Sequence, residues 1–429
     1  MRKIITSVIK DNEKDIIIPA ISSKSYVHRM LIGAALSKQK TQIAVNIISQ
    51  DMMATIQVLM SMGFHIKVDD KIFYVNSEAY QCPEDEIELD CIESGSTARF
   101  LLPVASALGM RFKMTGRGKL PQRPFEVICK AMEENGVDFK KNYSLPLTVS
   151  GQLKPGEYRI PGNISSQYIS GLLFALPLLQ GDSEIILTTE LESKPYVDIT
   201  LSVLKQFGIQ IYVNENGFSI PGNQTYQTEE EMKAEGDWSN AAFPLCMGAI
   251  GNGVTMTGLN PDSLQGDKII IDLLREFGCK IRCTDDQVCL FPDKLHGISV
   301  DVSQIPDLVP VLCIVAAFAE EESYFYQAQR LRMKESDRIE TTKSCLTALG
   351  GEMTVIEEPD GSTTLKVSSV QSLRGGMING SGDHRIVMAA ATAASAIMGR
   401  VVIEGAEAVD KSYPGFFEDM KDFICICEE

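Results

Sequence analysis

The clearest pattern in the chain is an amphipathic stretch that ends at a glycine and continues as alternating apolar residues. Its first copy runs from Val58 through Met62 to Gly63 and on to Ile66. Apolar positions three or four apart predict a helix, and alternation predicts a strand. A glycine between them supplies the left-handed residue that ends many helices. The pattern recurs about every 70 residues, with glycines at Gly63, Gly136, Gly208, Gly278 and Gly350.

A second predicted helix recurs in phase with the first. Each copy starts at Ser or Asp and continues as an almost wholly apolar run, which is typical of a capped, buried helix. The starts are Ser25, Ser96, Ser166, Ser239, Asp307 and Asp383. Short β-like runs lie between the helices, at Asp15–Pro19, Ile87–Leu89, Ser183–Leu187 and Val401–Ile403. We therefore predict an α/β fold of six similar units, three in each of two domains, with the crossover near Glu235–Ser239.

Composition narrows the class of protein. The 429 residues are 44% hydrophobic and 23% charged, which excludes a disordered or fibrous chain. Lys and Arg number 40 against 57 Asp and Glu, a net charge of −17. This balance argues against a nucleic-acid or anionic-membrane surface, but it allows a small anion in a locally basic cleft. The longest apolar runs, Leu308–Ala319 and Ile386–Gly399, are too short to span a membrane.

The cysteines and the first residues indicate the compartment. The start of the chain lacks the long apolar run and the small-residue cleavage site of a signal peptide. The eleven cysteines form no C-x-x-C pair, and no histidine adjoins the most closely spaced ones. We therefore expect a reduced cytoplasmic protein without a metal site.

Basic residues occur where the predicted helices begin. Lys24, Arg123, Lys334 and Lys411 are placed near predicted helix N-termini, where a positive side chain opposes the helix dipole. A surface ion pair explains any one of them. The set as a whole favours a ligand with more than one phosphate or carboxylate, because free helix N–H groups and a basic side chain together form an anion site.

The sequence gives little support for nucleotide binding, nucleophilic catalysis or metal-assisted catalysis. The sequence contains no P-loop, no complete dinucleotide-binding glycine motif, no G-x-S-x-G elbow and no H-E-x-x-H. Two carboxylates stand out instead, Asp307 and Glu335. Either is explained as a helix cap or an ion-pair partner, but beside an anion site either could act in general acid–base catalysis.

These motifs together resemble one family, EPSP synthase (3-phosphoshikimate 1-carboxyvinyltransferase), over essentially the whole chain. Any one of them is weak evidence, but their combination and order are specific. The segments that carry the resemblance are Lys24-Ser25-x-x-x-Arg29, Arg123-Pro124, Ser165-Ser166-Gln167, Ser193-Lys194-Pro195-Tyr196, Glu235-Gly236-Asp237, Lys334-Glu335-Ser336-Asp337-Arg338 and Asp383-His384-Arg385.

The resemblance implies a two-domain inside-out α/β barrel built from six βαβαββ repeats. One domain would comprise residues 1–20 and 237–429, the other residues 21–236, and the active site would lie in the cleft between them. The implied reaction transfers the enolpyruvyl group of phosphoenolpyruvate to the 5-hydroxyl of shikimate 3-phosphate, a step in chorismate and aromatic amino-acid biosynthesis. It proceeds by addition and elimination, releases phosphate and needs no metal or organic cofactor. The family leads us to expect a monomer.

The resemblance also implies a role for individual residues. Asp307 would take the proton from the 5-hydroxyl, Glu335 would deliver a proton to the methylene carbon, and His384 would assist. Shikimate 3-phosphate would contact Lys24, Ser25, Arg29, Ser165, Ser166, Gln167, Ser193, Tyr196 and Lys334. Phosphoenolpyruvate would lie between Lys24, Gly95, Arg123, Gln167, Arg338, Arg385 and Lys411.

Two positions depart from the family pattern. Many relatives have Asn in place of Glu93, whose carboxylate would repel phosphoenolpyruvate unless it turns away or pairs with a base such as Arg99. Some relatives have Asn in place of Arg330, so no contact is carried over for it. Both departures leave the geometry at Gly95 open.

Two alternatives stay open at this point. The sister enzyme that transfers enolpyruvyl to a UDP-amino sugar typically relies on a cysteine in a mobile loop, and the comparable stretch Arg111–Arg123 contains none. The second alternative is a non-catalytic repeat protein that binds anions, which would tolerate the loss of Asp307 and Glu335.

Overall fold

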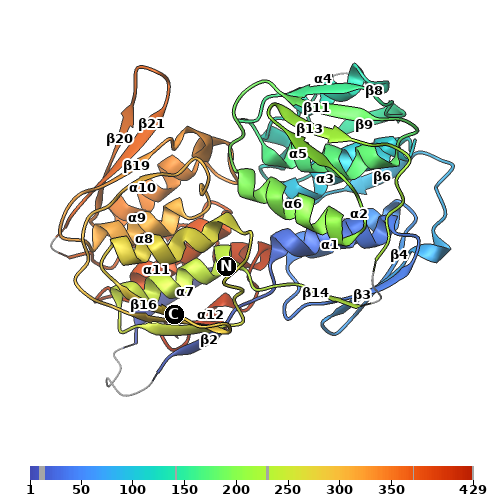
Figure 1. The fold of residues 1–429 in the computed structure, drawn as a ribbon. Coiled ribbons are helices and arrows are strands. Elements are labelled where there is room, and N and C mark those ends of the chain that lie inside the picture. Colours follow the sequence, from blue (N-terminus) through green and yellow to red (C-terminus); the bar gives the residue numbers. More distant parts are fainter. Residues whose placement is uncertain (9–14, 141–142, 229–230, 371, 428–429) are drawn as a thin grey trace. The chain divides into compact units, whose positions relative to one another are not determined.

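The computed structural model describes residues 1–8, 15–140, 143–228, 231–370 and 372–427. The chain divides into two compact units, which we call unit 1 (residues 1–23 and 235–429) and unit 2 (residues 24–234). Each unit contains three four-stranded sheets among its described residues. Within each unit the helices lie inside and the sheets outside (Figure 1), as the inside-out arrangement predicts.

All six sheets share one strand order. If the strands of each sheet are numbered 1 to 4 by their place in the repeat, their order across the sheet is 1-2-4-3. Strands 1 and 2 are parallel in every sheet. In unit 2 the first sheet contains β14 (Glu231–Lys233), β3 (Lys40–Ala44), β5 (Ile72–Asn76) and β4 (His65–Asp69). The second contains β6 (Ile87–Asp90), β7 (Phe112–Thr115), β9 (Leu147–Gly151) and β8 (Val137–Lys140). The third contains β10 (Glu157–Ile160), β11 (Ser183–Leu187), β13 (Gly217–Ile220) and β12 (Tyr212–Asn214).

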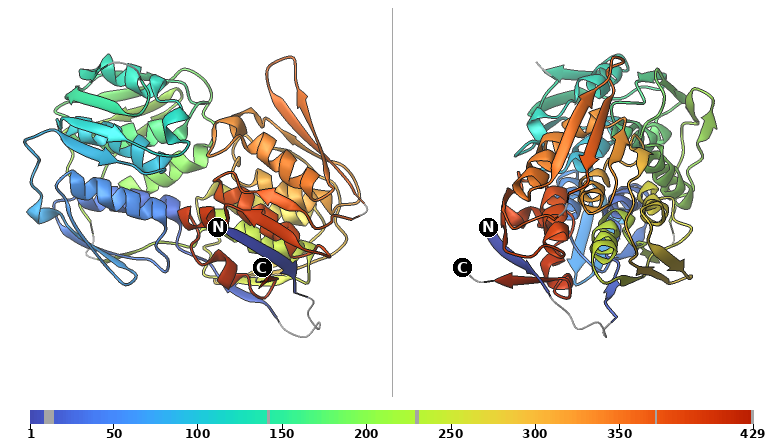
Figure 2. Two further views of the ribbon diagram at one scale, coloured as in Figure 1. Left: turned by 180° about the vertical axis from the view of Figure 1, so that it is seen from behind. Right: turned by 90° about the vertical axis from the view of Figure 1, so that its left-hand side faces the viewer.

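Unit 1 repeats the arrangement. Its sheets are β2 (Ile17–Pro19), β15 (Val254–Thr257), β17 (Gln287–Phe291) and β16 (Lys280–Cys283); β18 (Ser299–Asp301), β19 (Ser323–Tyr326), β21 (Thr363–Ser368) and β20 (Glu352–Glu357); and β22 (Met377–Asn379), β23 (Val401–Glu404), β1 (Arg2–Ser7) and β24 (Ile424–Cys427). The last sheet joins the two ends of the chain, because β1 pairs with β23 on one side and β24 on the other (Figure 2).

The two connections between the units exchange the first strands of two repeats. Strand β2 precedes the first helix of unit 2 in sequence, but it pairs with β15 of unit 1. Strand β14 precedes the second half of unit 1, but it pairs with β3 of unit 2. One sheet of each unit is therefore completed by a strand that directly precedes the crossover into the other unit.

The helices alternate between buried and amphipathic, as the sequence pattern predicts. The buried ones are α1 (Lys24–Leu36), α3 (Gly95–Ala107), α5 (Ser166–Ala175), α7 (Trp238–Ile250), α9 (Val309–Ala317) and α11 (His384–Ala394). The amphipathic ones are α2 (Gln50–Ser61), α4 (Glu126–Glu133), α6 (Lys194–Gln206), α8 (Ile270–Glu276), α10 (Arg338–Ala348) and α12 (Phe416–Asp419). No helix of the described chain is both long and apolar enough to cross a membrane.

The repeating glycines end their helices as predicted. Gly63, Gly136, Gly208, Gly278 and Gly350 all have positive φ, between 74° and 115°. At Gly63 a side chain is excluded by space as well as by conformation, because a Cβ there would lie 2.1 Å from the carbonyl oxygen of Gln81. The glycine thus lets the chain turn from helix to strand in five of the six repeats.

Helices α1, α3 and α7 each begin one residue before the predicted Ser25, Ser96 and Ser239. Helix α5 begins at Ser166 as predicted, and α11 is capped by the predicted Asp383. The side chains of Ser94, Ser165 and Asp237 cap α3, α5 and α7 by accepting backbone N–H bonds. Helix α9 is different, since its N-cap is Leu308 and Asp307 lies before it. The Asp307 carboxylate is therefore not used as a cap.

Candidate active site

The start of α1 presents basic groups that are held by neighbouring helices of unit 2. Lys24 is its first residue, and Lys24 Nζ lies 2.7 Å from Asp51 Oδ2 on α2. Arg29 is 3% exposed and donates to the Tyr196 carbonyl on α6 at 2.8 Å and to the Ser25 carbonyl at 2.7 Å. Burial lowers the pKa of Arg29 to about 10, so it stays charged at neutral pH.

The start of α6 adds two of the predicted residues. Ser193 is buried and has φ of 54°, a left-handed conformation that costs a non-glycine residue roughly 1 kcal/mol or more. Pro195 then fixes the first turn of the helix. The Tyr196 carbonyl accepts a hydrogen bond from the Arg29 guanidinium, which also donates to the Ser25 carbonyl. Helices α1 and α6 therefore bring Ser25, Arg29 and Tyr196 together.

The starts of α3 and α5 meet through Gln167. Its side-chain Nε2 donates to Ser96 Oγ at 2.9 Å, and its Oε1 accepts from Arg99 Nη1 at 2.7 Å. Ser165 caps α5 and accepts from the backbone N–H of Gln167 at 3.3 Å, and Ser166 follows it as the first residue of α5. The Arg99 guanidinium also lies over the rings of Phe125 and Tyr168. Arg99 was not among the predicted site residues, although it fixes the orientation of Gln167.

Gly95 and Arg123 are in direct contact. A Cβ built on Gly95 would lie 2.5 Å from Arg123 Nη1 and 3.2 Å from Arg99 Nη1. The absence of a side chain at Gly95 therefore admits two guanidinium groups to the first turn of α3. The Glu93 carboxyl group packs against Gly118, where a Cβ would lie 2.5 Å from Glu93 Cδ. These contacts form a compact set of cations and helix N–H groups, suited to a carboxylate or phosphate.

In unit 1, the Asp307 carboxylate forms ion pairs with three basic side chains. Its Oδ1 accepts from Arg338 Nη1 at 2.7 Å and lies 3.5 Å from Lys334 Nζ, and its Oδ2 lies 3.1 Å from Arg385 Nη2. Burial alone would raise the pKa of Asp307. The charges of Arg385, Lys334 and Arg338 outweigh burial and hold that pKa well below its usual range.

Arg338 is the centre of this cluster. It is 1% exposed, and besides Asp307 it contacts Glu335 Oε2 at 2.6 Å and Asp383 Oδ2 at 2.9 Å. Burial opposes its charge, but Asp383, Glu335 and Asp307 raise its pKa well above the usual value. The predicted acid–base pair Asp307 and Glu335 thus meets on one guanidinium, with the buried Asp383 as a third partner.

Nearby carboxylates only partly balance the positive charge of Lys334. Burial, with the nearby charges of Arg330 and Arg338, lowers its pKa to about 8, although Asp307 and Glu335 act in the opposite direction. Lys334 therefore approaches loss of its proton near neutral pH. An anionic ligand would favour its charged form.

The start of α11 brings the last predicted residues to the same place. Asp383 caps the helix and accepts from Ser336 Oγ and from the Arg385 backbone N–H. His384 is the first residue of the helix and is buried. Lys411 Nζ donates to the Gly382 carbonyl at 2.7 Å. Lys411 is the last residue of a 3₁₀ helix, Ala406–Lys411, and this bond places its ammonium group next to Asp383, the N-cap of α11.

The described residues fall into two sets. Unit 2 carries Lys24, Ser25, Arg29, Gly95, Arg123, Ser165, Ser166, Gln167, Ser193 and Tyr196, and unit 1 carries Asp307, Lys334, Glu335, Arg338, His384, Arg385 and Lys411. In the part of the chain that the structure describes, no three of His, Cys, Asp and Glu are grouped to hold a metal ion.

Comparison with known proteins decides the family. The sequence matches EPSP synthase (3-phosphoshikimate 1-carboxyvinyltransferase) over residues 9–420. The chain belongs to the EPSP synthase family. It is 44% identical over 403 residues to the 3-phosphoshikimate 1-carboxyvinyltransferase of Clostridium kluyveri, covering 93% of this chain and 92% of that one. It is 40% identical over 417 residues to the protein of that name from Clostridium novyi, covering 95% and 94%.

Solved structures of EPSP synthases share the fold. A structure of EPSP synthase from Acinetobacter baumannii superimposes with a TM-score of 0.80 at 23% identity and covers all of both chains. The enolpyruvyl transferase NikO from Streptomyces tendae gives a TM-score of 0.78 at 17% identity, covering 99% of each chain. The predicted α/β repeat fold of the EPSP synthase family is confirmed.

Two further polar residues extend the unit 1 set of this EPSP synthase family member. Asp267 lies in the 3₁₀ helix Gly266–Ile269 and accepts a short hydrogen bond from Ser239 Oγ, which also accepts from Arg385 Nη2 at 3.1 Å. Burial and the charge of Asp307 raise the pKa of Asp267 to about 6, against the effects of Arg385 and Ser239. Nothing in the sequence distinguished Asp267 from other acids, because its role depends on contacts with α7 and α11.

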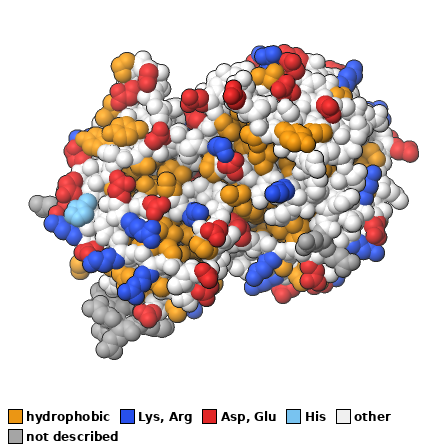
Figure 3. All heavy atoms as spheres, viewed as in Figure 1, with side chains coloured by type: hydrophobic (Ala, Val, Ile, Leu, Met, Phe, Trp, Pro, Cys, Tyr) orange, Lys and Arg blue, Asp and Glu red, His pale blue; other side chains and the backbone are white. Residues whose placement is uncertain are grey.

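The surface of this family member contrasts with these buried cations. Figure 3 shows acidic and basic side chains interspersed on the visible face of each unit. Exposed pairs such as Lys130–Glu126 and Lys67–Asp69 are solvated, and pairs of this kind contribute little to stability. Arg29, Arg338 and Arg385 of the candidate site differ because they are buried and each donates to more than one acceptor.

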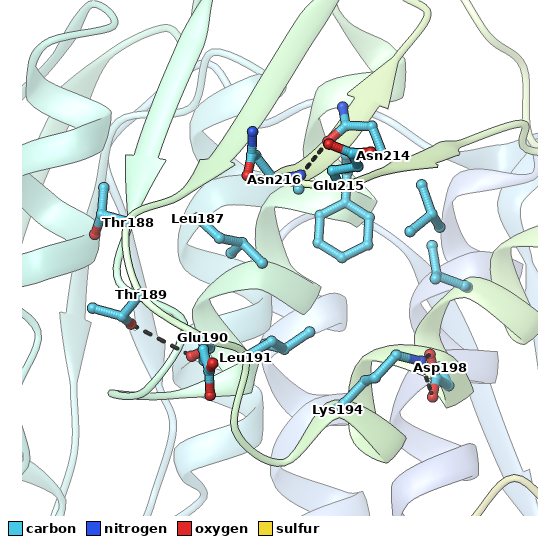
Figure 4. A pocket seen from close by; sticks show the side chains of 14 residues that line it. Leu187, Thr188, Thr189, Glu190, Leu191, Lys194, Asp198, Asn214, Glu215 and Asn216 are labelled. Carbon is cyan, nitrogen blue, oxygen red and sulfur yellow. Dashed lines mark hydrogen bonds and ion pairs between the residues drawn. The ribbon is translucent and has the colours of Figure 1, made fainter.

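A separate cavity of about 450 Å³ lies between α6 and the β12–β13 hairpin of unit 2 (Figure 4). Its lining includes the apolar side chains Leu187, Leu201 and Phe218, and also Lys194, which is paired with Asp198 at 2.6 Å. The described residues that line it include none of the predicted site residues. We therefore place the candidate active site on the helix starts and not in this cavity.

Proposed function

We propose that this protein is a 3-phosphoshikimate 1-carboxyvinyltransferase, which transfers the enolpyruvyl group of phosphoenolpyruvate to the 5-hydroxyl of shikimate 3-phosphate and releases phosphate. The observation that carries the proposal is the contact of Asp307 and Glu335 with the single buried guanidinium of Arg338. Membership of the EPSP synthase family over residues 9–420 supports the substrates.

The unit 2 set would bind the anionic groups of both substrates. Arg29, Ser25 and Tyr196 are joined by hydrogen bonds, which supports a common role in holding shikimate 3-phosphate, together with Ser165, Ser166, Gln167 and Ser193. Gly95 and Arg123 are in contact at the N-terminus of α3, which supports a site for phosphoenolpyruvate. Lys24 would serve both substrates. Planar Arg groups bind carboxylate and phosphate in bidentate geometry, so they fix orientation as well as charge.

The unit 1 set would carry the proton transfers. In the addition step, Asp307 takes the proton of the 5-hydroxyl as its oxygen bonds to C2 of phosphoenolpyruvate, and Glu335 delivers a proton to C3. In the elimination step Glu335 takes a proton back from the new methyl group, the bond from C2 to the phosphate oxygen breaks, and the proton held by Asp307 leaves with phosphate. The net change is a new ether bond and a restored C=C bond, with no oxidation.

The low pKa of Asp307 fits a base that works only when substrates are present. Three cations neutralise the carboxylate in the free protein, so it is a weak base there. Substrate phosphates and carboxylates would compete for Lys334, Arg338 and Arg385, and would thereby raise the basicity of Asp307. His384 is buried between Asp383 and Arg385, a position that supports an assisting role.

The cysteines favour this reaction over transfer to a UDP-amino sugar. The nearest cysteines to residues 111–123 are Cys91 and Cys129, both buried, and burial raises the pKa of each thiol strongly. A buried thiol with a raised pKa is a poor nucleophile or acid at neutral pH. We further propose a monomeric, cytoplasmic enzyme that needs no cofactor, since buried thiols of this kind suit a reducing compartment.

The deciding experiment is release of inorganic phosphate from a mixture of protein, shikimate 3-phosphate and phosphoenolpyruvate. We expect release that depends on both substrates. Release with a UDP-amino sugar in place of shikimate 3-phosphate would favour the sister enzyme. Binding of both anions without any release would favour the non-catalytic protein.

A further inference from the structure

A chain of buried hydrogen bonds crosses the interior of unit 2 from α1 to the start of α3. His28 Nδ1 lies 2.7 Å from Thr55 Oγ1 on α2, and Thr55 Oγ1 lies 2.7 Å from Thr97 Oγ1 on α3. Thr97 Oγ1 donates to Ser94 Oγ at 2.8 Å. We call Thr55, Thr97 and Ser94 the hydroxyl chain. All four side chains, including that of His28, are at most 1% exposed.

The order of donors in this chain fixes the tautomer of His28. Thr97 uses its one hydroxyl proton on Ser94, so it must accept from Thr55. Thr55 in turn uses its proton on Thr97 and must accept from His28. The His28 proton therefore lies on Nδ1, and Nε2 is the unprotonated nitrogen. Among the described residues, Nε2 has no hydrogen-bond partner.

The surroundings keep His28 neutral. Burial and the charges of Lys24 and Arg29 lower its pKa well below the usual value. From α3 it meets the edge of the Phe100 ring at a centroid distance of 6.5 Å, and from α2 it meets Thr55; Asp51 on α2 is paired with Lys24. A second proton would place a third positive charge beside Lys24 and Arg29, with no acceptor for Nε2.

Both ends of the chain adjoin residues of the candidate active site. His28 lies four residues after Lys24 and immediately before Arg29 on α1. Ser94 caps α3, where its Oγ also accepts from the Thr97 backbone N–H, and the next residue is Gly95 in contact with Arg123. Arg29 and His28 both pack on Phe100 of α3. The interior of unit 2 thus ties the second turn of α1, one turn after Lys24, to the first turn of α3.

We propose that His28 is a positioning residue: its Nδ1–H anchors the hydroxyl chain that holds Ser94 and, with it, the Gly95 turn. The inference rests on the proposed function, in which the Gly95 turn receives phosphoenolpyruvate. His28 does not touch a substrate. It fixes the position and orientation of the start of α3, which would contact the substrate, relative to Lys24 and Arg29.

The first test replaces the middle of the chain without changing its shape. Thr97→Val removes one hydroxyl and leaves Thr55 and Ser94 each short of a partner, a loss of the order that a buried hydrogen bond contributes, ~1–1.5 kcal/mol. We expect the KM for phosphoenolpyruvate to rise about tenfold, while the KM for shikimate 3-phosphate and kcat stay within about twofold.

The second test separates hydrogen bonding from packing at His28. His28→Leu fills the site but cannot donate, and we expect the same selective rise in the KM for phosphoenolpyruvate. His28→Asn places an amide N–H near the position of Nδ1–H, and we expect it to restore most of the affinity. The matched control is Thr41→Val on β3, because Thr41 is equally buried and its hydroxyl has no partner among the described residues.

The outcomes are separable. A selective KM effect that His28→Asn rescues, with Thr41→Val unchanged, supports the proposal. Unchanged KM in Thr97→Val and His28→Leu, or a uniform loss of Tm and of both affinities in all His28 variants, would overturn it.

A measurement independent of activity tests the tautomer itself. The chain contains only four histidines, so long-range ¹H–¹⁵N NMR can be assigned by substitution. We expect His28 to be neutral, with its proton on Nδ1, from pH 8 to pH 6. The Thr55→Val substitution should shift the resonances of the His28 ring nitrogens. A proton on Nε2 would contradict the chain, even in a protein that released no phosphate. Absent phosphate release with the expected tautomer would refute only the proposed function.

Discussion

Arg338 Nη1 donates to Asp307 Oδ1 across 2.7 Å, so the proposed base of the reaction is bound by a guanidinium that is itself buried. The same guanidinium contacts Glu335 and Asp383. Buried ion pairs of this kind are costly to desolvate, and removing one member is costlier still because the others lose their partner. The cluster is therefore better explained by chemistry than by stability alone.

The first prediction concerns the centre of that cluster. Arg338→Met leaves three carboxylates without their shared cation, and we expect the free energy of unfolding at pH 7 to fall by ~3–5 kcal/mol. Arg338→Lys keeps one charge but not the fork of donors, so its loss should be smaller. Urea unfolding measures both. The control is Arg275→Met, since Arg275 pairs with Asp272 at the surface of α8. Equal losses at Arg338 and Arg275 would contradict the role of the cluster.

The second prediction tests Asp307 as the base. Asp307→Asn keeps shape and hydrogen bonding but cannot accept the hydroxyl proton, so kcat should fall by about 10²–10⁴-fold. Binding of shikimate 3-phosphate, measured by calorimetry, should survive. Asp293→Asn is the control, because Asp293 is an exposed carboxylate paired with Lys280. Turnover that stays within a few-fold of wild type would remove Asp307 from the mechanism.

The third prediction concerns the contact between Gly95 and Arg123. The methyl group of Gly95→Ala would overlap Arg123 Nη1, and the guanidinium must move. Gly95 is not among the glycines with positive φ, so the backbone should not be strained and Tm should change little. We expect the KM for phosphoenolpyruvate to rise at least tenfold, with a smaller effect on shikimate 3-phosphate. Equal effects on both substrates would show that Arg123 does not serve phosphoenolpyruvate selectively.

Much of this architecture could be predicted because it depends on local pattern. The glycines Gly63 and Gly278 and the buried run of α9 are signals that follow directly from helix geometry. The pairing of β2 with β15 and of β14 with β3 has no local signal, since the paired strands are distant in sequence. Only the family resemblance, which groups residues 1–20 with 237–429, pointed to this exchange.

The residues of the candidate site also fall into those that could be predicted from the sequence and those that could not. Arg338 and Asp307 belong to motifs and could be named from the sequence. Asp267 and Arg99 could not, because the first acts through Ser239 and the second through Gln167, contacts that exist only after distant helices have packed. Lys411 could be placed at a helix start from the sequence, but its contact with the start of α11 exists only in the folded chain.

The fourth prediction is a pH dependence at Lys334. Its pKa of about 8 means that the free protein loses this charge as pH rises through 8. In the proposed site the charged form of Lys334 binds shikimate 3-phosphate, so we expect the KM for that substrate to rise from pH 7 to pH 9. Lys334→Arg stays charged throughout, so its KM should be flatter over the same range, even if it is higher at pH 7. A wild-type KM that does not change between pH 7 and pH 9 would refute the assignment.

The last prediction concerns Asp267, which is buried beside Asp307 and Arg385. Its pKa is raised to about 6 in the folded protein, against an ordinary value of 3.8, so the folded state disfavours the ionised form. Stability is therefore lost as pH rises from about 4 through 6, by an amount on the order of 3 kcal/mol for a shift of about two units. Asp267→Asn does not titrate, and we expect it to unfold at higher urea than wild type at pH 8 but not at pH 4.5.

The same variant should be a poorer enzyme. Asp267 holds Ser239, and Ser239 accepts from Arg385, so an uncharged amide would leave Arg385 more fully paired with Asp307 and weaken the base. We expect kcat of Asp267→Asn to fall while stability at pH 8 rises, a trade that is common where a buried charge serves function. The control is Asp272→Asn on the exposed face of α8, which should change neither quantity. Stability gained equally at pH 4.5 and pH 8 would show that packing, and not ionisation, is what Asp267 contributes.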